Sequence, residues 1–151
     1  MRRIVGWGLL SLLVVTMLGA CASMEAKPAA GPSLYRRLGG REGIAIVVND
    51  FTANMAADPR VNTRFKDVKP ADLERFKSNL ADQICDATGG PCSYLGKDMK
   101  TTHAGMKITE GEWNATVENL VKALDKHNIP AQSKQELLGA LGPMKKDIVG
   151  Q

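Results

Sequence analysis

The chain has few residues of the kinds that mark the commonest catalytic and metal sites. Among its 151 residues are only two histidines and three cysteines. It has no Ser-His-Asp arrangement and no HExxH motif, and zinc needs three or four N, S or O ligands at recognisable spacings. The glycine-rich stretches LGGREGI and TGGPCSYLGKD lack the spacing, and the Ser/Thr after lysine, that a phosphate loop requires. These absences argue against a zinc site, a nucleophilic triad and a nucleotide-binding loop.

Long alternation of apolar and polar residues is also missing, as are internal repeats and a Lys/Arg stripe with interleaved aromatics. The first absence argues against a β-sheet, and the last argues against nucleic acid as a partner. What is present is an ordinary globular composition, 44% hydrophobic and 24% charged, in a length that allows one domain.

Residues 1–20 have the pattern of an export signal. Arg2 and Arg3 precede an uncharged apolar run, Ile4–Leu18, and small residues follow it. The run has about 15 residues, whereas a membrane span needs roughly 20. The ending LGAC resembles a bacterial lipobox, in which the cysteine, here Cys21, becomes the lipidated first residue. We therefore expect an exported, membrane-anchored bacterial lipoprotein facing the periplasm. A soluble product of a cleaved signal and an uncleaved anchor are the alternatives.

Removal of the signal peptide takes away two arginines and no acidic residue, so the net charge falls from +4 to +2. The next segment, residues 21–32 with the sequence CASMEAKPAAGP, has no apolar periodicity and is typical of a flexible tether. The folded domain is expected over residues 33–151, with Ser33 as the N-cap of its first helix.

Beyond Ser33 the chain alternates helical patterns with Gly/Pro breaks, which predicts an all-α domain of six or seven helices. In each longer segment the apolar residues recur at spacings of three and four. Thr109 and Glu112 have the spacing of a capping box. The expected helices cover residues 34–38, 41–57, 71–87, 98–105, 109–127 and 133–149, with a turn over 61–65, and Gly139 and Gly142-Pro143 loosen the last helix.

Of the two histidines, His103 is the better candidate for a metal ligand. His127 falls in the last turn of its helix, where a partial positive charge is favourable without any ligand. His103 lies between Met99 and Met106 in the segment DMKTTHAGMKI, an apolar setting that suits a buried flat cofactor. One histidine in an apolar, helical shell suits haem better than zinc, because haem needs only one strong protein ligand.

Cys85 and Cys92 flank the turn TGGP and would lie close enough to form a disulfide. Two cysteines in an exported protein are expected to oxidise. Closing so short a loop contributes about 2–3 kcal/mol in the chain-entropy model. With Cys21 lipidated, no cysteine is left over. Two free buried thiols are the alternative.

Two longer motifs resemble those of the group 1 truncated haemoglobins. LYRRLGGREGIAIVVNDF is similar to the opening of that family, where a double glycine separates a short first helix from the second. ATGGPCSYLGKDMKTTHAGMKIT is similar to its middle, with a second glycine pair, a tyrosine near the haem and the proximal histidine. The resemblance runs from Leu34 to about Val149. It implies a truncated globin fold, a two-over-two helical sandwich enclosing haem b, which binds O2, NO or CO.

The resemblance also implies roles for residues by position. His103 matches the proximal iron ligand. The other matching positions are Phe65, which would stack on the haem, Phe51 beside the distal pocket, Tyr94, Met99 and Lys100 at the haem edge and a propionate, and Phe76, Leu80 and Ile84 on the distal helix face.

The distal side departs from the family's pattern. Thr52 stands where many members have a tyrosine that donates a hydrogen bond to O2, and Leu80 stands where a glutamine is frequent. Thr52, Asn79 and Gln83 are candidate polar replacements that the sequence does not rank. Asn79 is also a poor iron ligand, which favours an open or water-filled sixth site. Because a charge-assisted hydrogen bond is worth roughly 1.5–3 kcal/mol, we expect faster O2 release and easier autoxidation than in relatives with the tyrosine.

Three functions stay open, and the first is preferred. It is haem-dependent binding of diatomic gases, with NO detoxification as a further activity. The second is an exported haem redox protein that transfers electrons or acts as a weak peroxidase. The third is a haem-free, partner-binding lipoprotein. Whether the chain is an NO dioxygenase-like or peroxidase-like enzyme is left undecided, and the reductase is unknown.

Overall fold

The computed structural model describes residues 31–151, so the predicted signal peptide, Cys21 and most of the predicted tether lie outside the described residues. The described part contains six α-helices and two short 3₁₀ segments. The one β-type contact in this part of the chain is an isolated parallel bridge between Ile108 and Val149. The predicted all-α class is therefore confirmed. None of the described helices is both long enough and apolar enough to cross a bilayer.

The helices follow the predicted order, with small shifts at their ends. Their bounds are α1 Leu34–Arg37, α2 Gly40–Ala57, η1 Asn62–Arg64, α3 Pro70–Ala87, α4 Met99–His103, α5 Glu110–Lys126, α6 Ala131–Leu141 and η2 Gly142–Asp147. The largest difference concerns the helix expected over 133–149, because α6 already ends at Leu141 and the chain continues as the 3₁₀ segment η2. Pro143 explains this change, since it lacks the N–H that an α-helical hydrogen bond needs and its ring crowds the preceding turn.

Local sequence explains where two of the helices begin. Ser33 caps α1, and its side chain accepts a hydrogen bond from the Arg36 backbone N–H at 3.4 Å. At α5, the Thr109 hydroxyl accepts from the Glu112 N–H at 3.1 Å, while the Glu112 carboxylate accepts from the Thr109 N–H at 2.8 Å. This is a complete capping box. Both predicted caps are confirmed.

The double glycine between α1 and α2 is required by the backbone. Gly39 and Gly40 have φ angles of 86° and 67°, in the left-handed region that favours glycine. Nearby, a Cβ on Gly43 would lie 2.2 Å from the Leu38 carbonyl oxygen. These glycines let the short α1 fold directly back onto α2.

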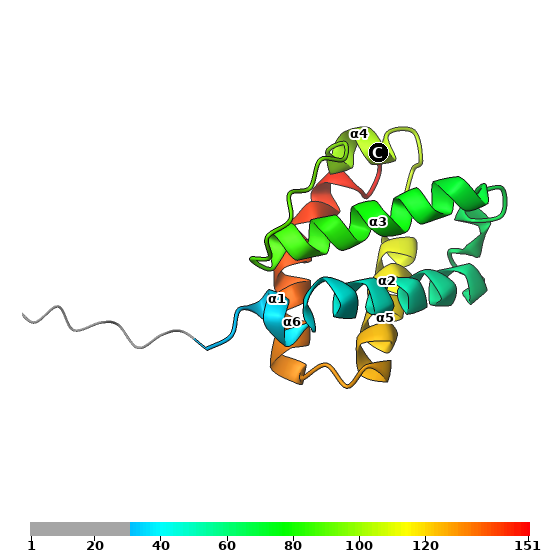
Figure 1. Ribbon diagram of the computed structural model, residues 1–151. Coiled ribbons are helices and arrows are strands. Elements are labelled where there is room, and N and C mark those ends of the chain that lie inside the picture. The colour runs from blue at the N-terminus through cyan, green and yellow to red at the C-terminus, as the bar shows by residue number, and fades with distance from the viewer. Residues whose placement is uncertain (1–30) are drawn as a thin grey trace, which may run out of the picture.

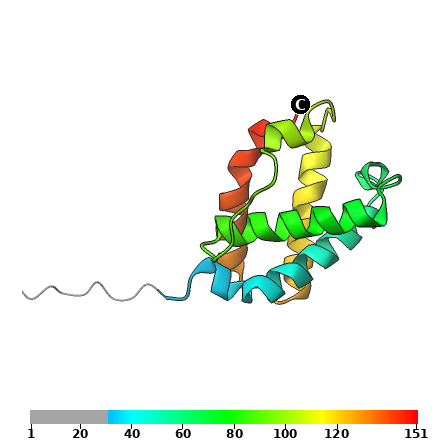
Figure 2. The same cartoon turned by 45° about the horizontal axis from the view of Figure 1, so that its top comes forward.

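The four longer helices form two crossed pairs. Figure 1 and Figure 2 show α2 and α3 side by side, running in opposite directions, with α5 and α6 crossing behind them. Residues 127–130 join α5 to α6, which also run in opposite directions. α2 packs on both α3 and α5, and its apolar side chains supply much of the core. The arrangement is the two-over-two sandwich that the resemblance implies.

A buried polar contact joins the end of α2 to α5. Asn119 is 1% exposed, and its amide donates to Asp58 Oδ2 at 2.8 Å. The Asn119 backbone carbonyl accepts from the Asn54 side chain at 3.2 Å. Hydrogen bonds from the Arg60 side chain and backbone, and from Asn119, hold the pKa of Asp58 well below its usual range. The sequence gives no local sign of this contact, because Asn119 and Asp58 lie 61 residues apart.

Candidate functional site

His103 is the last residue of α4 and is half-buried. Its Nδ1 lies 2.7 Å from the carbonyl oxygen of Met99, one helical turn earlier. Because a carbonyl only accepts, Nδ1 carries the proton in this hydrogen bond, and the neutral imidazole then has its free lone pair on Nε2. No residue of the described part hydrogen-bonds to Nε2. The ring is thus oriented by the backbone, as metal-binding histidines usually are, with Nε2 left for a metal.

The short helix α4 is stabilised by a cap rather than by burial. None of its residues is buried. At its start, Asp98 Oδ1 accepts from the Thr101 backbone N–H at 2.9 Å and Oδ2 accepts from the Thr101 hydroxyl at 2.6 Å. The Thr101 hydroxyl and N–H lower the pKa of Asp98, because they stabilise its charged form. α4 also packs against η2.

The loop before α4 is shaped by Tyr94. The Tyr94 hydroxyl donates to the Lys97 carbonyl at 2.7 Å, and its backbone N–H donates to Asp86 Oδ2 at 3.1 Å. A Cβ on Gly96 would lie 2.3 Å from the Tyr94 hydroxyl oxygen, so a larger residue at this position would displace the tyrosine ring. Burial raises the pKa of Tyr94. Contact of Tyr94 with the haem edge stays a prediction, while its contacts in the structure order the loop.

Cys85 and Cys92 are joined by a disulfide, with an Sγ–Sγ distance of 2.00 Å. Cys85 is fully buried near the end of α3, and Cys92 lies in the loop that leads to α4. A Cβ on Gly90 would come within 2.5 Å of the Cys85 sulfur, so the turn between them must pass close to the bond. The disulfide therefore attaches the start of this loop to the end of α3.

The aromatic and aliphatic positions fall into two groups. Phe65 and Phe76 meet edge to face, with ring centroids 6.1 Å apart, and Phe76 is 38% exposed. Leu80 is half-buried on the same helix, α3. Phe51 and Ile84 lie instead within the buried core. The structure thus leaves Phe65, Phe76 and Leu80 partly accessible, and direct haem contacts of Phe51 and Ile84 stay predictions.

The three polar candidates for the distal side have different surroundings. Thr52 is 3% exposed, and its hydroxyl donates to the Val48 carbonyl at 2.7 Å. The Gln83 amide nitrogen lies 3.4 Å from Met99 Sδ and 3.6 Å from Met144 Sδ. Asn79 is exposed. The sequence gives no sign of the contact between Gln83 and Met144, because Met144 belongs to an apolar helical repeat 61 residues away from Gln83.

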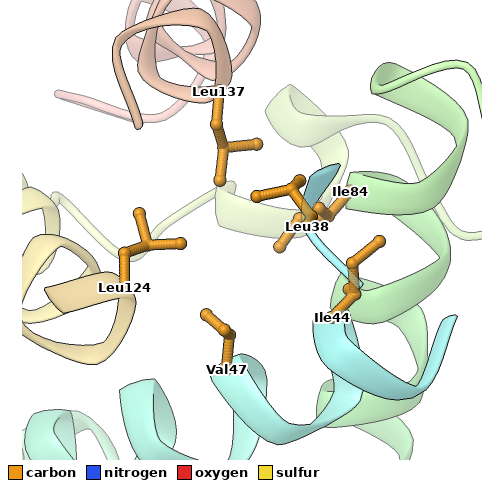
Figure 3. Close-up of a pocket in the computed structure, with 6 residues that line it drawn as sticks. All are labelled: Leu38, Ile44, Val47, Ile84, Leu124 and Leu137. Carbon is orange, nitrogen blue, oxygen red and sulfur yellow. The ribbon is translucent and has the colours of Figure 1, made fainter. Parts of the chain in front are cut away.

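Six apolar side chains line a small internal cavity, seen in Figure 3. The cavity has a volume of about 10 Å³, which is about the smallest space in which one water molecule fits. None of the lining residues belongs to α4, whereas Ile84 is one of the positions expected on the distal helix face. The lining residues are Leu38, Ile44, Val47, Ile84, Leu124 and Leu137.

The donor set fits haem better than a metal ion held by several side chains. Among residues 31–151 no group of three or more His, Cys, Asp or Glu side chains could hold a metal. A single imidazole with a free Nε2 is the ligand that haem iron needs. Accessible apolar side chains on α3 and just after α4, including Phe76 at 38% and Met106 at 36% exposure, suit the flat apolar face of a porphyrin. Lys100 is exposed on α4 and has no ion pair within the described part of the chain.

Comparison with known proteins agrees with this fit. Residues 33–149 match the model of the family described as bacterial-like globin. "Group 1 truncated hemoglobin GlbN" of Mycolicibacterium paratuberculosis is 32% identical over 124 residues, which cover 82% of this chain and 87% of the relative. The crystal structure of truncated hemoglobin from Tetrahymena pyriformis in the Fe(III) form superposes with a TM-score of 0.74 at 28% identity, covering 80% of this chain and all of that one. The 2/2 hemoglobin of Synechococcus, solved with covalently attached heme, gives 0.71 at 27% identity, covering 78% and 98%.

Proposed function

The chain belongs to the bacterial-like globins, within the group 1 truncated haemoglobins, and we propose that it binds O2, NO or CO at a haem b whose iron is held by His103. The observation that carries this proposal is the 2.7 Å hydrogen bond from His103 Nδ1 to the Met99 carbonyl, which leaves Nε2 free. When bound, the haem supplies the iron at which the gas binds.

Residues of α3 and α4, together with Phe65 and Tyr94, would hold the cofactor. Phe65, Phe76 and Leu80 offer partly accessible apolar surface for the porphyrin. Met99 lies one turn before His103, and the exposed ammonium of Lys100 suits the negative charge of a propionate. In this proposal Tyr94 acts at the haem edge through the loop that it orders.

The test is an absorption spectrum of the protein reconstituted with haem, in ferric, ferrous and ferrous-CO forms. We expect a Soret band for the natural chain and its loss in His103→Ala. His127→Ala is the matched control, because His127 caps α5 and its Nε2 bonds to Asp50 Oδ2 at 2.6 Å. Retention of the natural spectrum in His103→Ala would contradict the assignment. No band in the natural chain would favour a haem-free, partner-binding role.

NO detoxification is a further activity that we attach to this site. It would consume NO only in the presence of O2 and a reductant, so an NO electrode measures it directly. Electron transfer or weak peroxidase chemistry is the second candidate, and the commitment of the Thr52 hydroxyl to Val48 favours it because O2 then lacks that donor. A ferric spectrum that is six-coordinate and low-spin would favour this redox role over gas binding.

We also propose that the protein is an exported lipoprotein anchored through Cys21, on the strength of the sequence LGAC after an uncharged apolar run. Two acyl signals or an equivalent anchor hold a protein stably at a membrane. Metabolic labelling with a radioactive fatty acid should mark the natural chain and not Cys21→Ser, and only the natural chain should stay in the membrane fraction. Fatty-acid labelling of Cys21→Ser equal to that of the natural chain would contradict this proposal.

A further inference from the structure

We infer that the site favours NO and CO over O2 more strongly than relatives with a distal tyrosine do, because the polar side chains of residues 31–151 at or beside the distal positions have their donors committed elsewhere or directed away. The inference rests on the proposed binding of gases at haem. It concerns three polar residues at or beside the distal positions: Thr52, Gln83 and Asn79.

Thr52 cannot donate, although its position is the one where relatives carry a donor. Its hydroxyl has one proton, and that proton is given to the Val48 carbonyl in the preceding turn of α2, at 2.7 Å. At 3% exposure, the side chain is also closed off from the surface at which Phe76 and His103 are accessible. A threonine hydroxyl bonded in this way behaves toward a ligand much as a valine methyl would.

Gln83 donates towards the helix that carries His103. Its amide nitrogen contacts the sulfur of Met99, the first residue of α4, and the sulfur of Met144 in η2. Since α4 supplies the proximal ligand, this amide is directed to the proximal side and not across the face where a gas would bind. Gln83 is also half-buried, so the packing around it restricts a change of direction.

Asn79 lies on the outer side of α3. It precedes Leu80, and successive residues of an α-helix are about 100° apart around the axis. Leu80 packs against the core, whereas Asn79 and its neighbour Ser78 are both exposed. The Asn79 side chain therefore faces solvent.

The other positions expected on the distal side, which are Phe51, Phe76, Leu80 and Ile84, offer only apolar groups. O2 at haem iron carries partial negative charge and is stabilised by a donor, while CO and NO depend on one much less. A charge-assisted hydrogen bond of about 1.5–3 kcal/mol corresponds to roughly 10- to 100-fold in affinity, at 1.4 kcal/mol per tenfold. We expect the ratio of CO to O2 affinity to exceed that of tyrosine-bearing relatives by this factor.

The test combines O2 dissociation by stopped flow with the infrared stretching frequency of bound CO, which reports the local field without any turnover. Thr52→Val and Gln83→Leu should leave O2 dissociation within about twofold of the natural chain, and the CO band should stay at the frequency of an apolar pocket. Leu80→Gln adds an amide and should slow O2 dissociation about tenfold or more. Leu80→Met, which has a similar size and no donor, is the matched variant, and O2 dissociation should be at least about tenfold faster in it than in Leu80→Gln.

Several results would overturn the inference. Tenfold faster O2 dissociation in Thr52→Val or Gln83→Leu would show that the replaced side chain donates a hydrogen bond to O2. A CO band in the natural chain at the frequency of a pocket with a strong donor would also contradict the inference. The inference requires Leu80 to face the ligand. Unchanged O2 dissociation in a folded Leu80→Gln would show that it does not, and would contradict the inference. Absence of a Soret band in the natural chain would instead refute the proposed function itself, so the two failures are distinguishable.

Discussion

Helices α2 and α4 are held in the molecule by different means. α2 has 18 residues, six of them buried, and it packs on both α3 and α5. α4 has five residues, none of them buried, and it depends on the Asp98 cap, on the contact of Gln83 with Met99 and on η2. Burial therefore fixes the framework, whereas hydrogen bonds and a tethered loop fix the helix that carries His103. Stability and chemistry should respond to different substitutions.

The largest effect on stability should come from the core around α2. Leu124 of α5 is fully buried in this core, so Leu124→Ala should lower the free energy of unfolding by about 2–5 kcal/mol. Leu95, in the loop before α4, is 92% exposed, and Leu95→Ala should change the free energy of unfolding by less than about 0.5 kcal/mol. Urea unfolding measures both. Equal losses in the two variants would break the contrast between core and loop.

The disulfide should matter next, and mainly on the α4 side. Cys92→Ser should lower the free energy of unfolding by about 2–3 kcal/mol, because the disulfide joins residues with a sequence separation of 7. In Cys92→Ser the rate of amide hydrogen exchange should increase more in residues 91–98 and in α4 than in α2. Cys21→Ser is the control and should leave the exchange pattern unchanged. A thiol assay on the natural chain, unfolded without a reductant, that finds Cys85 and Cys92 as free thiols would contradict the disulfide.

The smallest effect should be the acid response of the α4 cap. The Thr101 hydroxyl and N–H lower the pKa of Asp98 below its usual value of 3.8. The cap's contribution is therefore complete above pH 3.8 and is lost as the pH falls through the lower, folded-state pKa. Faster exchange of the Thr101 and Thr102 amides in that range, followed by NMR, would show the loss. Asp98→Asn should keep the cap without this pH dependence, and Asp98→Ala should lose the cap at every pH.

The sequence predicted those features that depend on neighbouring residues. The capping box at Thr109, the cap at Ser33 and the order of the helices follow from local spacing, and all are present in the structure. The Asn119–Asp58 and Gln83–Met144 contacts each join residues 61 positions apart, and only the crossing of helices brings them together. The direction of the Thr52 hydroxyl depends on a side-chain rotamer, so the sequence left Thr52, Asn79 and Gln83 unranked.

The central claim is that His103 binds iron through Nε2 while its Nδ1 donates to the Met99 carbonyl. His103→Gly in the presence of imidazole tests this most directly, because the free base can occupy the space of the lost side chain. We expect the haem spectrum to be lost in His103→Gly and restored by imidazole. An imidazole methylated at one nitrogen can bind iron but cannot donate to Met99, so it should restore the spectrum only at a higher concentration. A spectrum in His103→Gly that equals that of the natural chain without any added base would contradict the claim.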